Sequence, residues 1–331
     1  GESRPVGFID LAPTLLRLAG VPVPDEMQGR AIFGQPSDEE NDYVFLYGDR
    51  FDEIYGMRRG LTDGRWKYIR RFTPDLAAAP YSFYQYGQAG WTAWNIAWKE
   101  GKLSPRFAKI WETGQAVDEL YDVDSDPAEM RNLAGDPAQR DRLELMRKAL
   151  RQKMVEVGDS GVIPEGMFAH LIAENGTVAD YVAQDESFAK KVDAAFTATS
   201  AATEAELLAL LKASDPVLQY WGARGVAIGS ASSTEMNKTL LGLLEHESES
   251  VVIAAANALA KTDHHEKAKQ RLLRVIDKST VEFELLEAVN AMYLHDWQGE
   301  IPAEWIDAMR KNGKGYVKRI ATELKNPRRP E

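Results

Sequence analysis

The densest group of potential metal ligands lies in segment 117–137, where seven Asp and Glu side chains surround two Asp-Pro steps. Within it, the run D-V-D-S-D (122–126) alternates its acids, as the first ligands of an EF-hand calcium loop do. Such a loop also needs a glycine at its sixth position and a glutamate at its twelfth, so that it can turn sharply and close around the ion. These positions hold Pro127 and Leu133. The spacing therefore excludes an EF-hand, and we expect no metal ligands in this chain.

The two Asp-Pro steps instead indicate the starts of helices. Asp126 can cap a helix in D-P-A-E (126–129), because proline fits the first helical position and Glu129 stands where a capping box needs an acid. The sequence D-P-A-Q (136–139) repeats this pattern, and Gly158 is a suitable stop for the helix that follows. Apolar residues recur at helical spacing in that second helix: Leu143, Met146, Leu150 and Met154.

Few other residues have the types or spacing needed for catalysis. The chain has no cysteine, which excludes disulfides, thiolate zinc sites and a cysteine nucleophile. His264 and His265 are adjacent, so on a helix their side chains diverge instead of meeting at one ion. No G-x-S-x-G, Walker A or H-E-x-x-H motif occurs. We expect no catalytic residue in this chain.

Charged residues gather in segment 47–60, at the end of an expected strand. We select four of them as candidate substrate-binding residues: Asp49, Arg50, Glu53 and Arg58. The segment 58–72 that overlaps it holds six basic residues against one acid: Arg58, Arg59, Arg65, Lys67, Arg70 and Arg71 against Asp63. Guanidinium groups match the oxygens of sulfate and carboxylate, so this patch suits an anionic ligand. The alternative is an ordinary solvated face of a hairpin.

Three tryptophans, Trp91, Trp94 and Trp98, fall on one face of an expected helix in the aromatic-rich segment 81–112. Such a face could stack on sugar rings or contact another subunit. Burial within this part of the chain is the interpretation that we favour.

The elements that must position these residues begin with short strands. Segments 43–47 and 118–123 each predict one strand, and Asp63-Gly64 within 56–72 is a strong signal for a hairpin turn between two more. Before them, residues 10–19 predict a helix with Asp10 as its cap. That helix is apolar on nearly all sides, so we expect it to be buried.

Helical repeats follow after about residue 160. Segment 207–227 aligns with 240–260 at an offset of 33, and 272–292 follows at an offset of 32. Each unit predicts a leucine-rich helix, a polar turn and a second helix with small residues, which is typical of HEAT-like solenoids. The expected fold class is therefore α+β: a small antiparallel sheet with packed helices, followed by an all-α HEAT-like solenoid.

The composition limits the classes of partner. With 331 residues, 44% hydrophobic and 27% charged, the chain is long enough for two or three domains with their own cores. No apolar run is long enough to predict a membrane span, and no signal peptide is visible. The net charge of −11 opposes binding to nucleic acid. A homo-oligomer stays open.

Several motifs together resemble the closing third of a sulfatase, a member of the alkaline-phosphatase-like superfamily. They are D-L-A-P-T-L-L-R-L-A-G-V (10–21), M-Q-G-R (27–30), G-R-W-K-Y-I-R (64–70) and E-L-Y-D-V-D-S-D-P-A-E-M-R-N-L-A-G-D-P (119–137). The resemblance covers roughly residues 6–157 and does not include the repeats.

The resemblance implies a catalytic region upstream of this chain. The sulfatase nucleophile is a formylglycine made from a C-x-P-S-R or S-x-P-S-R motif, and neither occurs here. The calcium ligands of the family also precede the counterpart of helix 10–19, which packs on the central sheet of the catalytic region. The resemblance further implies a sulfated sugar or aryl sulfate as substrate and a periplasmic or secreted location.

We therefore divide the chain into a tail of the catalytic domain (1–40), a sulfatase C-terminal subdomain (41–158), a helical linker region (159–203) and HEAT-like repeats (204–331). The expected function is the C-terminal part of a sulfatase, inactive by itself, that aids substrate selection. The alternative is a non-catalytic HEAT-like interaction module on a sulfatase-derived platform.

Overall fold

The computed structural model describes residues 5–33, 43–77, 82–229 and 233–325. Their contacts divide the chain into two compact units that interleave along the sequence. The unit that we call the sheet unit comprises Gly1–Gly48, Arg58–Arg71 and Ala116–Asp159, and the helical unit comprises Asp49–Met57, Phe72–Gln115 and Ser160–Glu331. The consecutive boundaries expected from the sequence stay a prediction.

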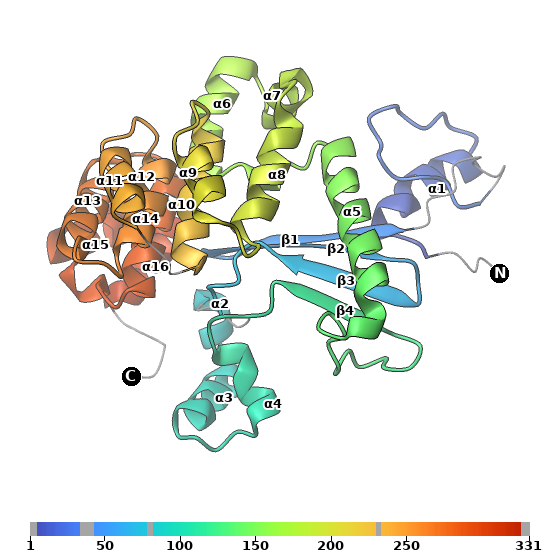
Figure 1. Ribbon diagram of the computed structural model, residues 1–331, viewed down its shortest axis with the longest axis horizontal. Coiled ribbons are helices and arrows are strands. Elements are labelled where there is room, and N and C mark those ends of the chain that lie inside the picture. The colour runs from blue at the N-terminus through green and yellow to red at the C-terminus, as the bar shows by residue number, and fades with distance from the viewer. Residues whose placement is uncertain (1–4, 34–42, 78–81, 230–232, 326–331) are drawn as a thin grey trace. The chain divides into compact units, whose positions relative to one another are not determined.

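Four strands form one sheet in the order β1-β2-β3-β4 (Figure 1). Their bounds are Val44–Phe51, Ile54–Thr62, Trp66–Arg71 and Asp118–Asp122. Strand β3 pairs antiparallel with both β2 and β4. The expected turn at Asp63-Gly64 is confirmed: Gly64 has a φ of 100°, and an Asp63 carboxylate oxygen accepts hydrogen bonds from the backbone N–H groups of Arg65 and Trp66. The α+β class is likewise confirmed.

Helix α5 (Arg140–Glu156) packs on β3 and covers one face of the sheet (Figure 1). The predicted cap is present, because Asp136 Oδ1 accepts a hydrogen bond of 3.0 Å from the backbone N–H of Ala138. Gly158 ends the helix with a φ of 61°. The four apolar residues expected on its inner face are all buried: Leu143, Met146, Leu150 and Met154.

The helix start predicted at Asp126 is wrong, because residues 126–130 form turns. The Asp126 carboxylate accepts hydrogen bonds from the backbone N–H groups of Met130 and Arg131. Glu129 has a φ of 52°, outside the helical region, and its carboxylate binds the ammonium of Lys67 at 2.8 Å. Lys67 on β3 therefore binds Glu129, the acid that a capping box would have needed.

Helix α1 (Leu11–Leu18) forms where the sequence predicted it, but the Asp10 side chain does not cap it. The Asp10 carboxylate accepts hydrogen bonds of 2.9 Å from the backbone N–H groups of Gly7 and Arg30, so it fastens the segment after the helix. Of the helix itself, only Pro13 and Thr14 are buried. Five apolar side chains around it are exposed and form what we call the α1 patch: Phe8, Ile9, Leu11, Leu15 and Leu18. Nothing in the described sheet unit buries this helix as the sequence led us to expect.

The helical unit begins with short helices. Helices α2 (Phe83–Tyr86), α3 (Ala89–Lys99) and α4 (Pro105–Ala108) precede Trp111, and α6 (Phe168–Asn175), α7 (Val178–Gln184) and α8 (Phe188–Ala198) follow later. Trp91, Trp94 and Trp98 pack around the buried Trp111, with ring centroids 5.0 to 6.0 Å from its ring. All three are partly buried in this cluster, which agrees in part with the interpretation favoured from the sequence.

Four helical pairs complete the unit (Figure 1). The first helices are α9 (Glu204–Leu211), α11 (Thr234–Leu243), α13 (His265–Lys278) and α15 (Ala303–Asn312), and the second are α10 (Pro216–Gly229), α12 (Glu249–Leu259), α14 (Glu282–Leu294) and α16 (Gly315–Lys325). The starts of the second helices are evenly spaced along the chain at an offset of 33. Each first helix contacts the second helix of its own pair, and the second helices contact one another in the order α10, α12, α14, α16, which we call the second-helix layer. His264 and His265 stand at the start of α13, as expected.

Candidate functional site

Three of the four candidate substrate-binding residues, Asp49, Arg50 and Glu53, belong to the helical unit, and Arg58 belongs to the sheet unit. Asp49 and Arg50 lie near the end of β1, and Glu53 lies in the two-residue turn between β1 and β2. Asp52 makes this turn with a φ of 48°. The turn is held by the helical unit: Asn290 donates a hydrogen bond of 2.8 Å to the Glu53 carbonyl, and Arg319 lies 3.2 Å from an Asp52 carboxylate oxygen.

The guanidinium of Arg50 already binds other side chains of the protein. Its guanidinium donates to both carboxylate oxygens of Glu165 and lies over the rings of Phe283 and Tyr316, at 5.0 and 5.7 Å. Asp49 Oδ1 lies 3.3 Å from the hydroxyl of Tyr55, which donates at 2.6 Å to the Gly161 carbonyl. These contacts fix the hairpin on the helices, so the charges at its tip do not project as a free anion-binding set.

The basic patch of the sheet unit is largely neutralised. Five of its six basic residues form ion pairs with acids of the same unit: Arg59–Asp159, Arg65–Asp122, Lys67–Glu129, Arg70–Asp118 and Arg71–Glu119. Arg58 stands opposite Arg71 across β2 and β3, and desolvation together with that second guanidinium lowers the pKa of Arg58. Arg58 is thus the member of the patch with most capacity left for an anion.

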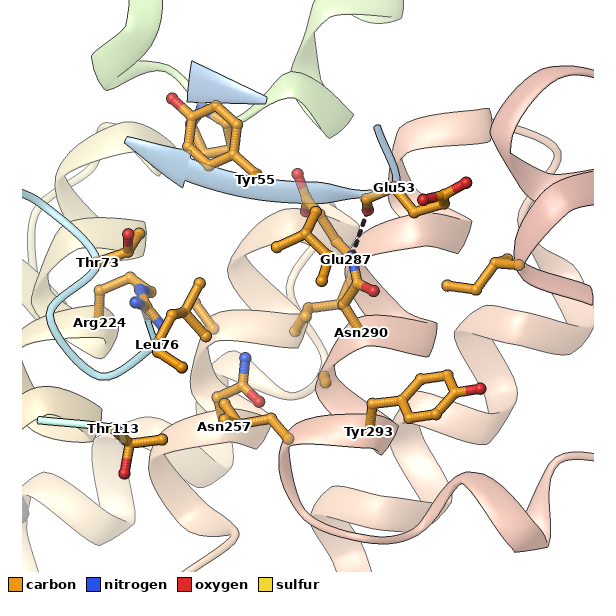
Figure 2. A pocket seen from close by; sticks show the side chains of 18 of the residues that line it. Glu53, Tyr55, Thr73, Leu76, Thr113, Arg224, Asn257, Glu287, Asn290 and Tyr293 are labelled. Atoms are coloured by element: carbon orange, nitrogen blue, oxygen red, sulfur yellow. Dashed lines mark hydrogen bonds between the residues drawn. The ribbon is translucent and has the colours of Figure 1, made fainter. Parts of the chain in front are cut away.

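A cavity of about 320 Å³ opens in the helical unit and includes Glu53 in its wall (Figure 2). This volume lies within the range of ligand-binding pockets, about 300–1,000 Å³. The second-helix layer forms much of the wall, through Arg224 of α10, Asn257 of α12, Glu287 and Asn290 of α14, and Ile320 of α16. The hairpin adds Tyr55, and the segment after β3 adds Thr73 and Leu76. Several parts of the chain far apart in sequence therefore build one site.

A row of polar side chains crosses the second-helix layer at the cavity. Arg224, Asn257 and Asn290 occupy the same position in three successive repeats, since each follows the previous one by one repeat length. Sequence reasoning missed these residues. The available signal was the repeat alignment itself, in which Arg224 and Asn257 fall at the same place among small and apolar neighbours.

Each member of this row has a defined partner. Arg224 donates a hydrogen bond of 2.6 Å to Asp75. Burial works against its positive charge, but Asp75, Tyr220 and Glu287 together raise the pKa of Arg224. Asn257 Oδ1 lies 3.0 Å from His295 Nε2. Burial lowers the pKa of His295 to about 4, so near neutral pH its ring is neutral and donates from Nε2 to that oxygen. The Asn257 amide nitrogen is thereby left to donate toward the cavity.

Glu287 is an acid of the cavity wall whose pKa is shifted strongly. Its Oε1 accepts a hydrogen bond of 3.1 Å from the backbone N–H of Gly166, and its Oε2 accepts one of 2.7 Å from the hydroxyl of Ser250. These bonds favour the carboxylate, but burial outweighs them and, with Glu165 nearby, raises the pKa of Glu287 to about 7. This acid is therefore partly protonated near neutral pH.

The remaining wall is aromatic and weakly polar. Tyr86, Trp111, Tyr220 and Tyr293 contribute rings, and Thr73 and Thr113 contribute hydroxyl groups. Burial raises the pKa of Tyr220, so its hydroxyl stays protonated and can both donate and accept. This combination of rings, amides and hydroxyl groups is suited to binding a polar ligand. Among the described residues it brings together no nucleophile and base.

The groups implied by a sulfatase active site do not fit the residues present. In the described ranges no three His, Asp or Glu side chains gather as a metal site, and the chain holds no cysteine from which formylglycine could be made. The Asp122 carboxylate instead binds Arg65 at 2.9 Å. Among the helices described, none is long and apolar enough to cross a membrane.

Comparison with known proteins relates different parts of the chain to two groups. Residues 204–292 match the HEAT repeat family. An ulvan-active sulfatase of Formosa agariphila is 33% identical over 162 residues, which is 48% of this chain and 27% of that protein. A second ulvan-active sulfatase of the same organism is 28% identical over 171 residues, which is 49% of this chain and 31% of that protein. The chain thus spans less than a third of either relative, and part of it is related to sulfatases.

Proposed function

We propose that this chain is the C-terminal part of a sulfatase that acts on a sulfated polysaccharide. The observation that carries the proposal is the similarity of about half the chain to two ulvan-active sulfatases, of which it spans 27% and 31%. The motifs at 10–21, 64–70 and 119–137 support the same relationship. In this proposal the formylglycine and calcium belong to sequence outside this chain, and the protein works in the periplasm or outside the cell.

The α1 patch supports the proposal that another part of the same protein packs against α1. Phe8 is 91% exposed and Leu15 is 66% exposed, and a groove runs between α1 and the segment around Met27. Apolar side chains gathered on one exposed helix mark an interaction surface. We assign this surface to the catalytic region of the same protein, whose central sheet the counterpart of this helix covers in sulfatases.

Two forms of the protein test the proposal. The longest natural reading frame that contains this chain would be produced together with a formylglycine-generating enzyme, beside the 331-residue chain. Sulfate release from ulvan and from 4-nitrophenyl sulfate would be measured for both. We expect release by the longer form and none above buffer by the chain alone. Turnover by the chain alone, or inactivity of the longer form on both substrates, would contradict the proposal.

A second function is favoured by the HEAT repeat match over residues 204–292. HEAT repeats present extended surfaces that bind other proteins, so the repeats could serve a non-catalytic interaction module. In that case the longer reading frame would lack the C-x-P-S-R or S-x-P-S-R motif. Its sequence distinguishes the two functions before any assay.

A further inference from the structure

The cavity of the helical unit has a charge pattern that separates it from a sulfate site. Four acids stand in its wall, at Glu53, Glu165, Glu287 and Asp296, against one cation, Arg224. That cation is itself bound to Asp75. A sulfate or carboxylate placed here would lose its hydration and lie among acids, while the cation of the described wall is already paired with Asp75. The cavity therefore disfavours anions.

Two of these four acids, Glu165 and Glu287, are poorly placed to hold a cation. Glu165 is neutralised by Arg50, and Glu287 uses both oxygens on Gly166 and Ser250. Burial also keeps Glu287 partly protonated at neutral pH. An amine in the cavity would lose its hydration, and Glu165 and Glu287 would offer it few free carboxylate oxygens in exchange.

The groups left to meet a ligand suit hydroxyl groups. Asn257 presents an amide N–H because His295 holds its oxygen, and Asn290 presents an amide oxygen because its nitrogen is held by the Glu53 carbonyl. The Tyr220 hydroxyl lies in the same wall and can donate or accept. Figure 2 shows Asn257 and Asn290 on neighbouring helices at the cavity. Hydroxyl groups both donate and accept, so they can satisfy such a mixed set.

The wall also offers rings against which a sugar can stack. Tyr220 and Tyr293 supply aromatic surface, and an apolar ring face above a polar edge is the chemistry of a pyranose. We propose that this cavity binds one uncharged sugar ring of the polymer, and that sulfated residues are bound elsewhere. This inference rests on the proposed function for the polymer but concerns a separate site.

Matched glycosides test the charge preference on the 331-residue chain. The neutral probes are the methyl glycosides of glucose, galactose, mannose and xylose. The charged probes on the glucose ring are its 6-sulfate, its uronate and its 2-amino derivative. Binding would be followed by saturation-transfer NMR and by chemical-shift titration. We expect at least one neutral glycoside to bind, and the sulfate and uronate of the same series to bind at least about tenfold more weakly, a difference of about 1.4 kcal/mol.

Variants locate the binding. Asn257→Ala removes the amide donor and should weaken the neutral glycoside about three- to tenfold, the effect of one lost hydrogen bond. Asn257→Asp keeps an acceptor for His295 while it removes the donor, and thermal melting of both variants shows whether each is folded. Asn312→Ala changes an exposed asparagine at the end of α15 and should have no effect.

Each outcome decides for or against the cavity assignment. The assignment is overturned if the sulfate, the uronate or the amine binds more tightly than the neutral glycoside, or if no neutral glycoside binds. It is also overturned if both Asn257 variants bind the neutral glycoside as tightly as the parent chain does. Neutral binding that depends on Asn257, in a protein whose longer form releases no sulfate, supports the assignment and contradicts only the proposed sulfatase function.

Discussion

Replacing Glu287 by glutamine should make the stability of the helical unit less dependent on pH. Glutamine has nearly the same shape and cannot ionise. Its side-chain oxygen can still accept from the Gly166 backbone N–H, and its amide can donate to the Ser250 hydroxyl, so both contacts of Glu287 are retained. The variant therefore isolates the effect of the charge.

The magnitude follows from the raised pKa. The pKa of Glu287 in the folded chain is about 7, against an ordinary value of 4.5, because burial disfavours the carboxylate. Below about pH 4.5 both states hold the proton, and no penalty exists. As the pH rises toward 7 the unfolded chain loses its proton first, so the free energy of unfolding falls. Above pH 7 the loss is complete, at about 3 kcal/mol for a pKa raised from 4.5 to about 7.

Thermal melting at about pH 5 and about pH 8.5 measures this effect. We expect Glu287→Gln to melt close to the parent chain at the lower pH and several degrees higher at the upper pH, since about 1 kcal/mol moves the melting temperature by about 2–4 °C in a chain of this size. Glu247→Gln, at an exposed acid in the turn before α12, is the matched control. Equal melting of Glu287→Gln and its parent at both pH values, or the same gain from Glu247→Gln, would refute the reasoning.

The other predictions concern the sheet unit. Asp118→Asn should lower the free energy of unfolding of the sheet unit by about 3–5 kcal/mol in urea titrations, because Arg70, a buried arginine of β3, then lacks its charge partner. Asp124→Asn, at an exposed acid, should change this free energy little. Leu15→Ser should reduce self-association of the isolated chain in sedimentation experiments, whereas Leu145→Ser, at an exposed leucine of α5, should not; equal behaviour of the two would remove the α1 patch as an interface. Calorimetric titration should detect no tight calcium site at 122–126, because these acids already bind Arg65 and backbone N–H groups; a tight site would contradict that assignment.

Features whose cause lies within a few residues could be predicted from the sequence. Asp63-Gly64 makes its turn with its own carboxylate and its own positive φ, and Asp136 caps the next N–H groups along the chain. The helix at Asp126 was wrong for the opposite reason. Its outcome depends on Lys67, which lies 62 residues away from Glu129 and binds it.

The candidate site shows the same limit. The charged hairpin was recognised, and Glu53 does line the cavity, but the partners that occupy its other charges are 115 and 267 residues away, at Glu165 and Arg319. No local pattern could reveal them. The Asn257 and Asn290 row could have been found, because a repeated position places side chains in register along a solenoid. Finding it requires a search of the repeat alignment for polar residues that recur at one position of the second helices.

The interleaving of the two units has a consequence for biosynthesis. The Glu53 carbonyl accepts its hydrogen bond from Asn290, which is 237 residues later in the chain. During synthesis the hairpin tip is therefore exposed long before α14 is made. At about 5–20 residues per second this interval lasts on the order of ten seconds or more. During it, the apolar wall formed by Ile54, Tyr86 and Trp111 lacks the helices that line the cavity with it. The nascent protein is therefore most vulnerable to aggregation and proteolysis before its last repeats are made, and a stop codon within those repeats would damage segments near the opposite end of the chain.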